Sequence, residues 1–95
     1  MVKTVPFDAT KYLSDPESQI VFLEEAFESG DPQFVAHALG IIARARGISS
    51  IARETGLSRE ALYRSLSSDG NPTITTVMDV MRALGLKLSP HKTAA

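Results

Sequence analysis

Hydrophobic side chains recur every three or four positions along most of the chain, which is the spacing of one face of a helix. The first such stretch follows Ser14-Asp15-Pro16-Glu17, where serine and glutamate have the spacing of a capping box and proline lies in the first turn. It ends at Gly30, a residue suited to a left-handed cap. We therefore expect a helix over residues 14–30.

A second expected helix carries apolar residues on more than one face. Asp31-Pro32 predicts its start and Gly47 predicts its end. Its apolar residues form two neighbouring stripes, made of Phe34, Val35, Ala38, Leu39, Ile41 and Ile42. A surface this broad is typical of a central helix that packs on more than one side.

The second half of the chain predicts shorter elements separated by turn residues. In order, they are a helix capped by Ser49 or Ser50 and reaching Thr55, a helix from Ser58 to Leu66, a helix from about Thr76 to Leu84, a short strand over residues 86–88 and a frayed tail over residues 89–95. The fold class is therefore all-α with five helices. We expect residues 1–95 to form a single domain, with residues 31–88 as its core.

The composition fits one small globular domain. Of the 95 residues, 43% are hydrophobic and 22% are charged, which are usual proportions for a folded domain. The chain has no cysteine, which excludes disulfides and thiolate metal sites, and no apolar run approaches the ~18 residues of a membrane span. The first four residues do not open a signal peptide. We expect a cytoplasmic protein that does not associate with membranes.

The net charge of −1, taken alone, argues against nucleic-acid binding. The charges are, however, unevenly distributed along the chain. Residues 1–36 carry a net charge of −5, whereas residues 37–95 carry +4 and hold all six arginines. Arginine is the residue best suited to forked contacts with phosphate and guanine. The partition predicts two differently charged surfaces; the alternative is an ordinary solvated charge pattern.

Residues 51–64 have the pattern of a helix-turn-helix motif, in which two short helices cross steeply through a short turn. We expect Ala52 where the helices cross, because a larger side chain would separate them, and Gly56 in the turn for its backbone freedom. Four apolar residues would bury the inner faces of the two helices: Ile51, Leu57, Leu62 and Leu66.

The outer face of the second motif helix carries the candidate chemistry. Arg59 and Arg64 suit forked contacts with guanine or phosphate, and Tyr63 can donate to phosphate or contact a thymine methyl group. Glu60 has two interpretations, as an acceptor from cytosine or as a complement to the positive helix terminus. Nearby loops and helix starts are suited to hold phosphates. The candidate DNA-binding residues are Ser50, Ser58, Arg59, Glu60, Tyr63, Arg64, Ser67, Asn71 and Thr73.

The remaining polar residues do not form a catalytic constellation. His37 and His91 have no carboxylate or histidine at a ligand spacing, the serines lack a base partner, and no glycine-rich phosphate loop is present. We therefore expect neither enzymatic activity nor a metal or cofactor.

The arginines outside the face of the second motif helix are expected to be solvated or ion-paired; they are Arg44, Arg46 and Arg53. Tyr63 has an alternative role as a packing residue.

Motifs both inside and outside the helix-turn-helix resemble the HigA-type addiction-module antidote proteins. The matching segments are Phe7-Asp8, Tyr12-Leu13, Gly30-Asp31-Pro32, Ala38-Leu39-Gly40, Ile42-Ala43-Arg44-Ala45-Arg46-Gly47, Gly56-Leu57-Ser58-Arg59-Glu60, Leu62-Tyr63, Leu66-Ser67, Gly70-Asn71-Pro72 and Ala83-Leu84-Gly85-Leu86. The resemblance covers residues 7–88.

The resemblance implies a Cro/lambda-repressor-like domain that binds and neutralises a RelE/ParE-type toxin encoded beside it. Family members usually form dimers and repress their own operon by binding double-stranded operator DNA. Such toxins are generally basic, which makes Glu24, Glu25, Glu28 and Asp31 candidates for toxin docking. A phosphate-clamping glutamine that is common in the family is replaced here by Ser50, which predicts weaker hold on the operator.

Two alternatives to an antitoxin share the same fold. One is a stand-alone Cro-type transcriptional regulator without a toxin partner, and the other is a helical interaction adaptor that no longer binds nucleic acid. The acidic residues also have a second interpretation, as a solvated helix face. The identity of the neighbouring gene and the salt dependence of DNA binding distinguish these functions.

Overall fold

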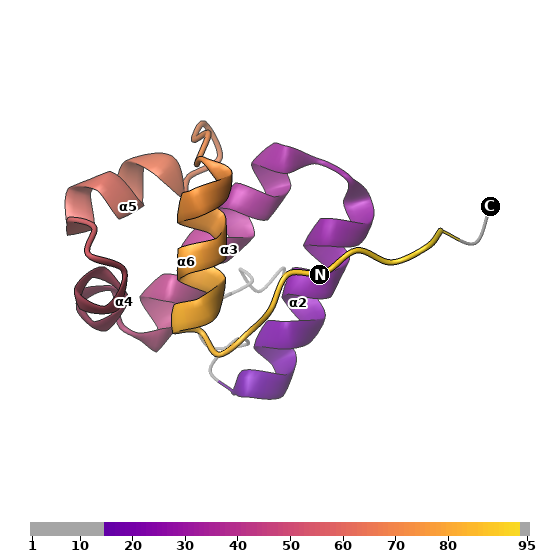
Figure 1. Ribbon diagram of the computed structural model, residues 1–95, viewed down its shortest axis with the longest axis horizontal. Coiled ribbons are helices and arrows are strands. Elements are labelled where there is room, and N and C mark those ends of the chain that lie inside the picture. Colours follow the sequence, from indigo (N-terminus) through magenta and orange to yellow (C-terminus); the bar gives the residue numbers. More distant parts are fainter. Residues whose placement is uncertain (1–14, 94–95) are drawn as a thin grey trace, which may run out of the picture.

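The computed structural model describes residues 15–93, which fold into five helices without a strand (Figure 1). The helices are α2 (Pro16–Ser29), α3 (Pro32–Arg46), α4 (Ile48–Thr55), α5 (Arg59–Ser65) and α6 (Ile74–Ala83). The all-α prediction is confirmed for this range. The motifs at Phe7 and Tyr12 lie outside it.

Helix α2 begins one residue later than its capping-box pattern predicts. Asp15 is the N-cap, since its side chain accepts a 3.0 Å hydrogen bond from the Ser18 amide, and Pro16 opens the helix. Hydrogen bonding by the Ser18 side chain and backbone holds the pKa of Asp15 below its usual value. The predicted cap, Ser14, lies outside the described residues. At the other end, Gly30 adopts a φ of 70° and caps the helix as predicted.

Helix α3 lies at the centre of the molecule and contacts each of the other four helices, as its broad apolar surface predicts. Asp31 caps it by accepting from the Gln33 amide at 3.0 Å. At Gly40, a side chain would overlap the backbone carbonyl of Leu66 at the end of α5. The missing side chain therefore lets α3 and the end of α5 approach closely.

Two further helix starts, those of α4 and α6, differ from the predictions. Neither Ser49 nor Ser50 caps α4, because α3 and α4 are joined by Gly47 alone, whose carbonyl accepts from the Ser50 and Ile51 amides at 3.1 Å. Helix α6 begins at Ile74, two residues before the expected start, because the Thr73 hydroxyl caps the Thr76 amide at 3.1 Å. In both cases the helix takes in residues that the sequence pattern assigned to a cap or a loop.

The predicted strand over residues 86–88 is wrong. The segment after α6 is extended but has no neighbouring strand within residues 15–93 with which to pair. Leu86 instead donates its amide to the Met81 carbonyl at 2.8 Å, and Leu86 and Leu88 pack against the core. The alternating pattern arises because Leu86 and Leu88 pack against the core, whereas Lys87 between them is exposed.

One polar network links three helices beside the apolar core. Gln19 on α2 is only 2% exposed, and its Oε1 accepts a 2.7 Å hydrogen bond from Nε of Arg46. The same guanidinium donates to the Leu84 carbonyl at 3.3 Å, at the end of α6. Arg46 thus has a structural role: it remains exposed to solvent, as expected, and its guanidinium forms these hydrogen bonds rather than an ion pair with residues 15–93. None of the helices described is long and apolar enough to span a bilayer.

Candidate nucleic-acid interface

Helices α4 and α5 are two short helices joined by the turn over residues 56–58, where the sequence predicts a helix-turn-helix motif. Gly56 ends α4 in the left-handed conformation, with a φ of 77° and its amide bonded to the Ala52 carbonyl at 2.9 Å. Thr55 stabilises the turn, because its hydroxyl donates to the Ile51 carbonyl at 2.8 Å and accepts from the Leu57 amide at 3.3 Å. The turn therefore uses local hydrogen bonds to fix the direction in which α5 leaves.

The inner side of the motif is anchored in the core. Leu62 is fully buried and Ile51 is 3% exposed, while Ala52 and Leu57 are half-buried against the core cluster. The loop after α5 folds back against the last turn of that helix, where a side chain at Gly70 would overlap backbone carbonyls. Packing on this side leaves the opposite side of α5 exposed to solvent.

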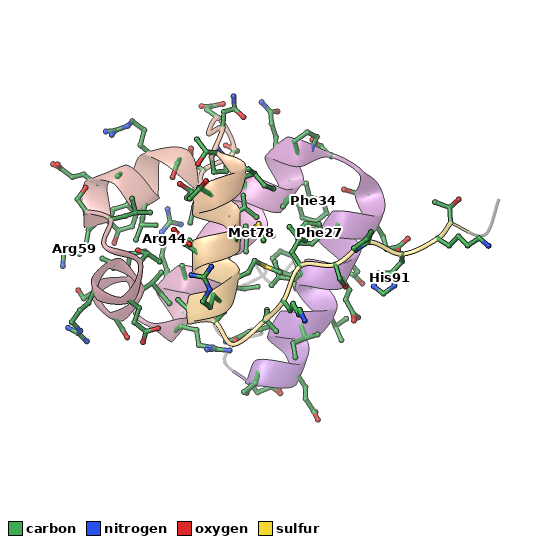
Figure 2. The ribbon with its side chains drawn as sticks, in the orientation of Figure 1. Phe27, Phe34, Arg44, Arg59, Met78 and His91 are labelled. Atoms are coloured by element: carbon green, nitrogen blue, oxygen red, sulfur yellow. The ribbon has the colours of Figure 1, made fainter. Side chains whose placement is uncertain are left out.

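The outer side of α5 presents the predicted side chains to solvent. Arg59, Glu60, Tyr63 and Arg64 are all exposed, and Arg59 lies at the end of the molecule formed by α4 and α5 (Figure 2). The side chains of Glu60 and Arg64 form no hydrogen bond or ion pair with residues 15–93. They are therefore free to contact a ligand, which agrees with the sequence interpretation of this arc.

Arg59 and Tyr63 are each held by a residue that sequence reasoning missed. A guanidinium nitrogen of Arg59 donates to the Ser49 hydroxyl at 3.3 Å, which links α5 to α4. The guanidinium carbon of Arg44, at the end of α3, lies 5.1 Å from the centroid of the Tyr63 ring, a cation–π distance. Arg44 thus joins the candidate interface, although its spacing from Tyr63 in the sequence gave no signal of the contact.

The smaller candidate residues fall into two groups. The hydroxyls of Ser58 and Thr73 act as helix caps and accept from the amides of Ala61 and Thr76. The Ser67 hydroxyl donates to the Arg64 carbonyl at 3.1 Å. The side chains of Asn71, exposed in the loop, and of the half-buried Ser50 form no hydrogen bond with residues 15–93. Ser58 and Ser67 border the two ends of α5, Asn71 and Thr73 follow in the loop before α6, and Ser50 lies in the first turn of α4. Capping is therefore an established role for Ser58 and Thr73, and contact with phosphate remains a prediction.

The acidic candidates lie on the far side of the molecule from α5. Glu24, Glu25 and Glu28 are exposed on α2, which occupies the opposite end of the view from α5 (Figure 1). Asp31 follows α2 but uses a carboxylate oxygen to cap α3. The structure therefore separates the acidic α2 from the cationic side of α5, as the charge partition of the sequence predicts.

Comparison with known proteins places this architecture in a family. Residues 3–92 match the family described as "Probable addiction module antidote protein". An uncharacterized protein of Haemophilus influenzae is 47% identical over 81 residues, which cover 85% of this chain and 84% of the relative. No solved structure matches. Because the family match spans all five described helices and most of the segment after α6, the chain belongs to the addiction-module antidote family.

Proposed function

We propose that this protein is an antitoxin that neutralises a RelE/ParE-type toxin and, as a homodimer, represses its own operon. The family supports the antitoxin role, and the helix-turn-helix supports the repressor role. The observation that carries the DNA-binding part is the outer side of α5, where Arg59, Tyr63 and Arg64 lie exposed together. This α5 surface faces away from the core that orients it.

The chemistry of the α5 surface suits the major groove. An arginine guanidinium matches the two acceptors of guanine or the oxygens of a phosphate, and such helices meet base edges in the groove. Arg64 has no partner among residues 15–93, so no internal hydrogen bond is lost when it binds. Arg44 over the ring of Tyr63 adds a further positive charge beside the same helix.

Charge distribution supports a repressor that depends on a specific site. The net charge of −1 gives little general attraction for DNA, while residues 37–95 carry +4. A dimer would place two copies of α5 about one helical turn of DNA apart, roughly 34 Å. Binding would therefore require paired half-sites as well as local positive charge.

Substitution of the α5 arginines tests the DNA-binding role. We expect Arg64→Ala or Arg59→Ala to weaken binding to the DNA upstream of this chain's gene by about 1–3 kcal/mol and to relax specificity at one base pair. Fluorescence anisotropy at fixed salt measures the loss. The charge-matched control is Lys87→Ala, which removes one cation in the segment after α6 and should leave the affinity nearly unchanged.

Two outcomes would contradict this role. If both arginine variants bind the upstream DNA as tightly as the wild type, α5 does not read the operator. If the wild type shows no salt-dependent affinity for that DNA, the protein is not a repressor of its own operon, and a helical interaction adaptor becomes the better description.

A further inference from the structure

A groove runs between α2 and the extended segment that follows α6, with a volume of about 530 Å³. In Figure 1 this segment leaves the end of α6 and crosses α2. The groove is mainly apolar, and the apolar side chains that line it are Ile20, Leu23, Phe27, Met81, Leu86 and Leu88. Its volume is within the range of protein binding clefts.

One wall of the groove combines apolar and acidic side chains. Ile20, Glu24 and Glu28 follow one another at four-residue intervals along α2, so they form a single stripe on the helix and all three line the groove. Ile20 is 39% exposed, a large apolar side chain open to water. A partner that covers this stripe must therefore offer apolar surface and positive charge together.

The two carboxylates on this wall are not neutralised within the described chain. Glu24 and Glu28 form no ion pair with any of residues 15–93, where the ion pair present joins Arg82 and Asp79. Lys87 and His91 line the groove from the other side but do not bridge to either glutamate. Figure 2 shows the His91 ring near α2 at the edge of the molecule. The stripe therefore keeps its negative charge available for an incoming cation.

We propose that this groove is the toxin-docking site and that it binds an amphipathic, basic segment of the toxin. An apolar side chain of that segment occupies the space beside Phe27 and Leu88, while neighbouring lysines or arginines pair with Glu24 and Glu28. This inference rests on the proposed antitoxin function. It narrows the acidic candidates to the two glutamates that line the groove and excludes Glu25 and Asp31, which do not.

A second copy of this chain is a poorer occupant on electrostatic grounds. A two-fold contact brings the same surface of both copies together. Near the two-fold axis, Glu24 and Glu28 of each copy would approach the same carboxylates of the other, and such like charges repel. The second copy would bring Lys87 and His91 from its own groove but no further basic residue of this lining to offset that repulsion. A basic partner removes this repulsion and is also attracted at long range before contact.

The groove can be tested with paired substitutions on one helix. The probe is the purified protein encoded beside this chain's gene, titrated into the full chain by calorimetry. We expect Ile20→Ser and Glu24→Gln each to weaken its binding about fivefold, and the double variant about tenfold or more. The controls, Val21→Ser and Glu25→Gln, make the same changes at exposed positions one residue along α2, outside the groove, and should change affinity less than about twofold.

The outcomes distinguish failure of the groove proposal from failure of the proposed antitoxin function. If the wild type binds the neighbouring protein and relieves its toxicity in growing cells, but the groove variants bind as tightly as their controls, the groove proposal is overturned and the antitoxin function stands. If the wild type neither binds that protein nor relieves toxicity, both are overturned. Circular dichroism confirms that all four exposed substitutions leave the helices intact.

A cross-linking experiment identifies the occupant directly. A photoreactive benzoylphenylalanine placed at Ser89, which lines the groove, should join the chain to the neighbouring protein through a segment rich in lysine or arginine. The same group at Val21 should not. Cross-links to a second copy or to residues 1–14 of this chain, in the presence of the neighbouring protein, would overturn the proposal.

Discussion

Among single residues, we expect Arg46 to contribute more to the free energy of unfolding than Arg53, although both lie in the last turn of a helix. Its guanidinium joins the nearly buried Gln19 to the end of α6. We expect Arg46→Ala to lower the free energy of unfolding by about 1–3 kcal/mol, because a charged donor is lost from a buried amide oxygen. Urea denaturation monitored by circular dichroism measures the change.

Arg53→Ala is the matched control for this prediction. Both arginines lie in the last turn of a helix, so the loss of a positive charge near the helix terminus is common to both variants. Arg53 is exposed and has no side-chain partner among residues 15–93, so its loss should cost less than about 0.5 kcal/mol. Equal losses for the two variants would mean that the Gln19 network contributes nothing.

Sequence reasoning predicted which residues of the α5 surface are exposed but missed the roles of two neighbouring arginines. The exposed arc of α5 follows from helical spacing and the burial of Leu62, both of which are local. The contacts of Arg44 with Tyr63 and of Arg46 with Gln19 join different helices, and Gln19 precedes Arg46 by 27 positions. Such pairings depend on how helices pack, and hydrophobic periodicity does not specify them.

At the scale of elements, the close approach of α3 and the end of α5 depends on Gly40. Alanine is favoured over glycine within a helix by about 1 kcal/mol. Here its Cβ would overlap the Leu66 carbonyl, which belongs to the backbone and cannot rotate aside, and overpacking of this kind costs about 1–3 kcal/mol. We expect steric overlap to prevail, so that Gly40→Ala lowers the urea midpoint.

His37→Ala on the same helix isolates the contribution of helix propensity. His37 is exposed, so alanine there should raise stability by a few tenths of a kcal/mol without any overlap. The two alanine substitutions in α3 are therefore expected to have opposite signs. A stabilising Gly40→Ala would show that α5 can shift away from α3 at little cost.

Helix boundaries were predictable where a side chain marks them. Asp31-Pro32 and Ser58 open α3 and α5 by side-chain capping, and both starts were read from the sequence. Helix α4 has no side-chain cap, because its N-cap is Gly47, the single residue between α3 and α4. Thr73 also caps its helix by a side-chain hydrogen bond, although the sequence pattern placed the start of α6 near Thr76. Local caps are visible in a sequence, whereas a start imposed by packing of the preceding helix is not.

At the scale of the whole molecule, the net charge of −1 is the sum of two separate surfaces. Helix α5, which carries Arg59 and Arg64, lies at one end of the helical array, and α2, which carries Glu24, Glu25 and Glu28, lies at the other, with α3 and α6 between them (Figure 1). Under the proposed function, this separation would let DNA and a basic protein approach different parts of the described chain. The low total charge limits attraction to DNA in general without preventing attraction at one surface.

Separate surfaces predict that DNA and the partner protein bind at the same time. In a gel shift with upstream DNA, added neighbouring protein should slow the complex further without releasing the DNA. Arg64→Ala should weaken only the DNA step and Glu24→Gln only the partner step, because α3 and α6 lie between α5 and α2 and distant effects add within about 0.5 kcal/mol. Release of the DNA by the partner, or one substitution that weakens both steps equally, would mean that the two surfaces are coupled.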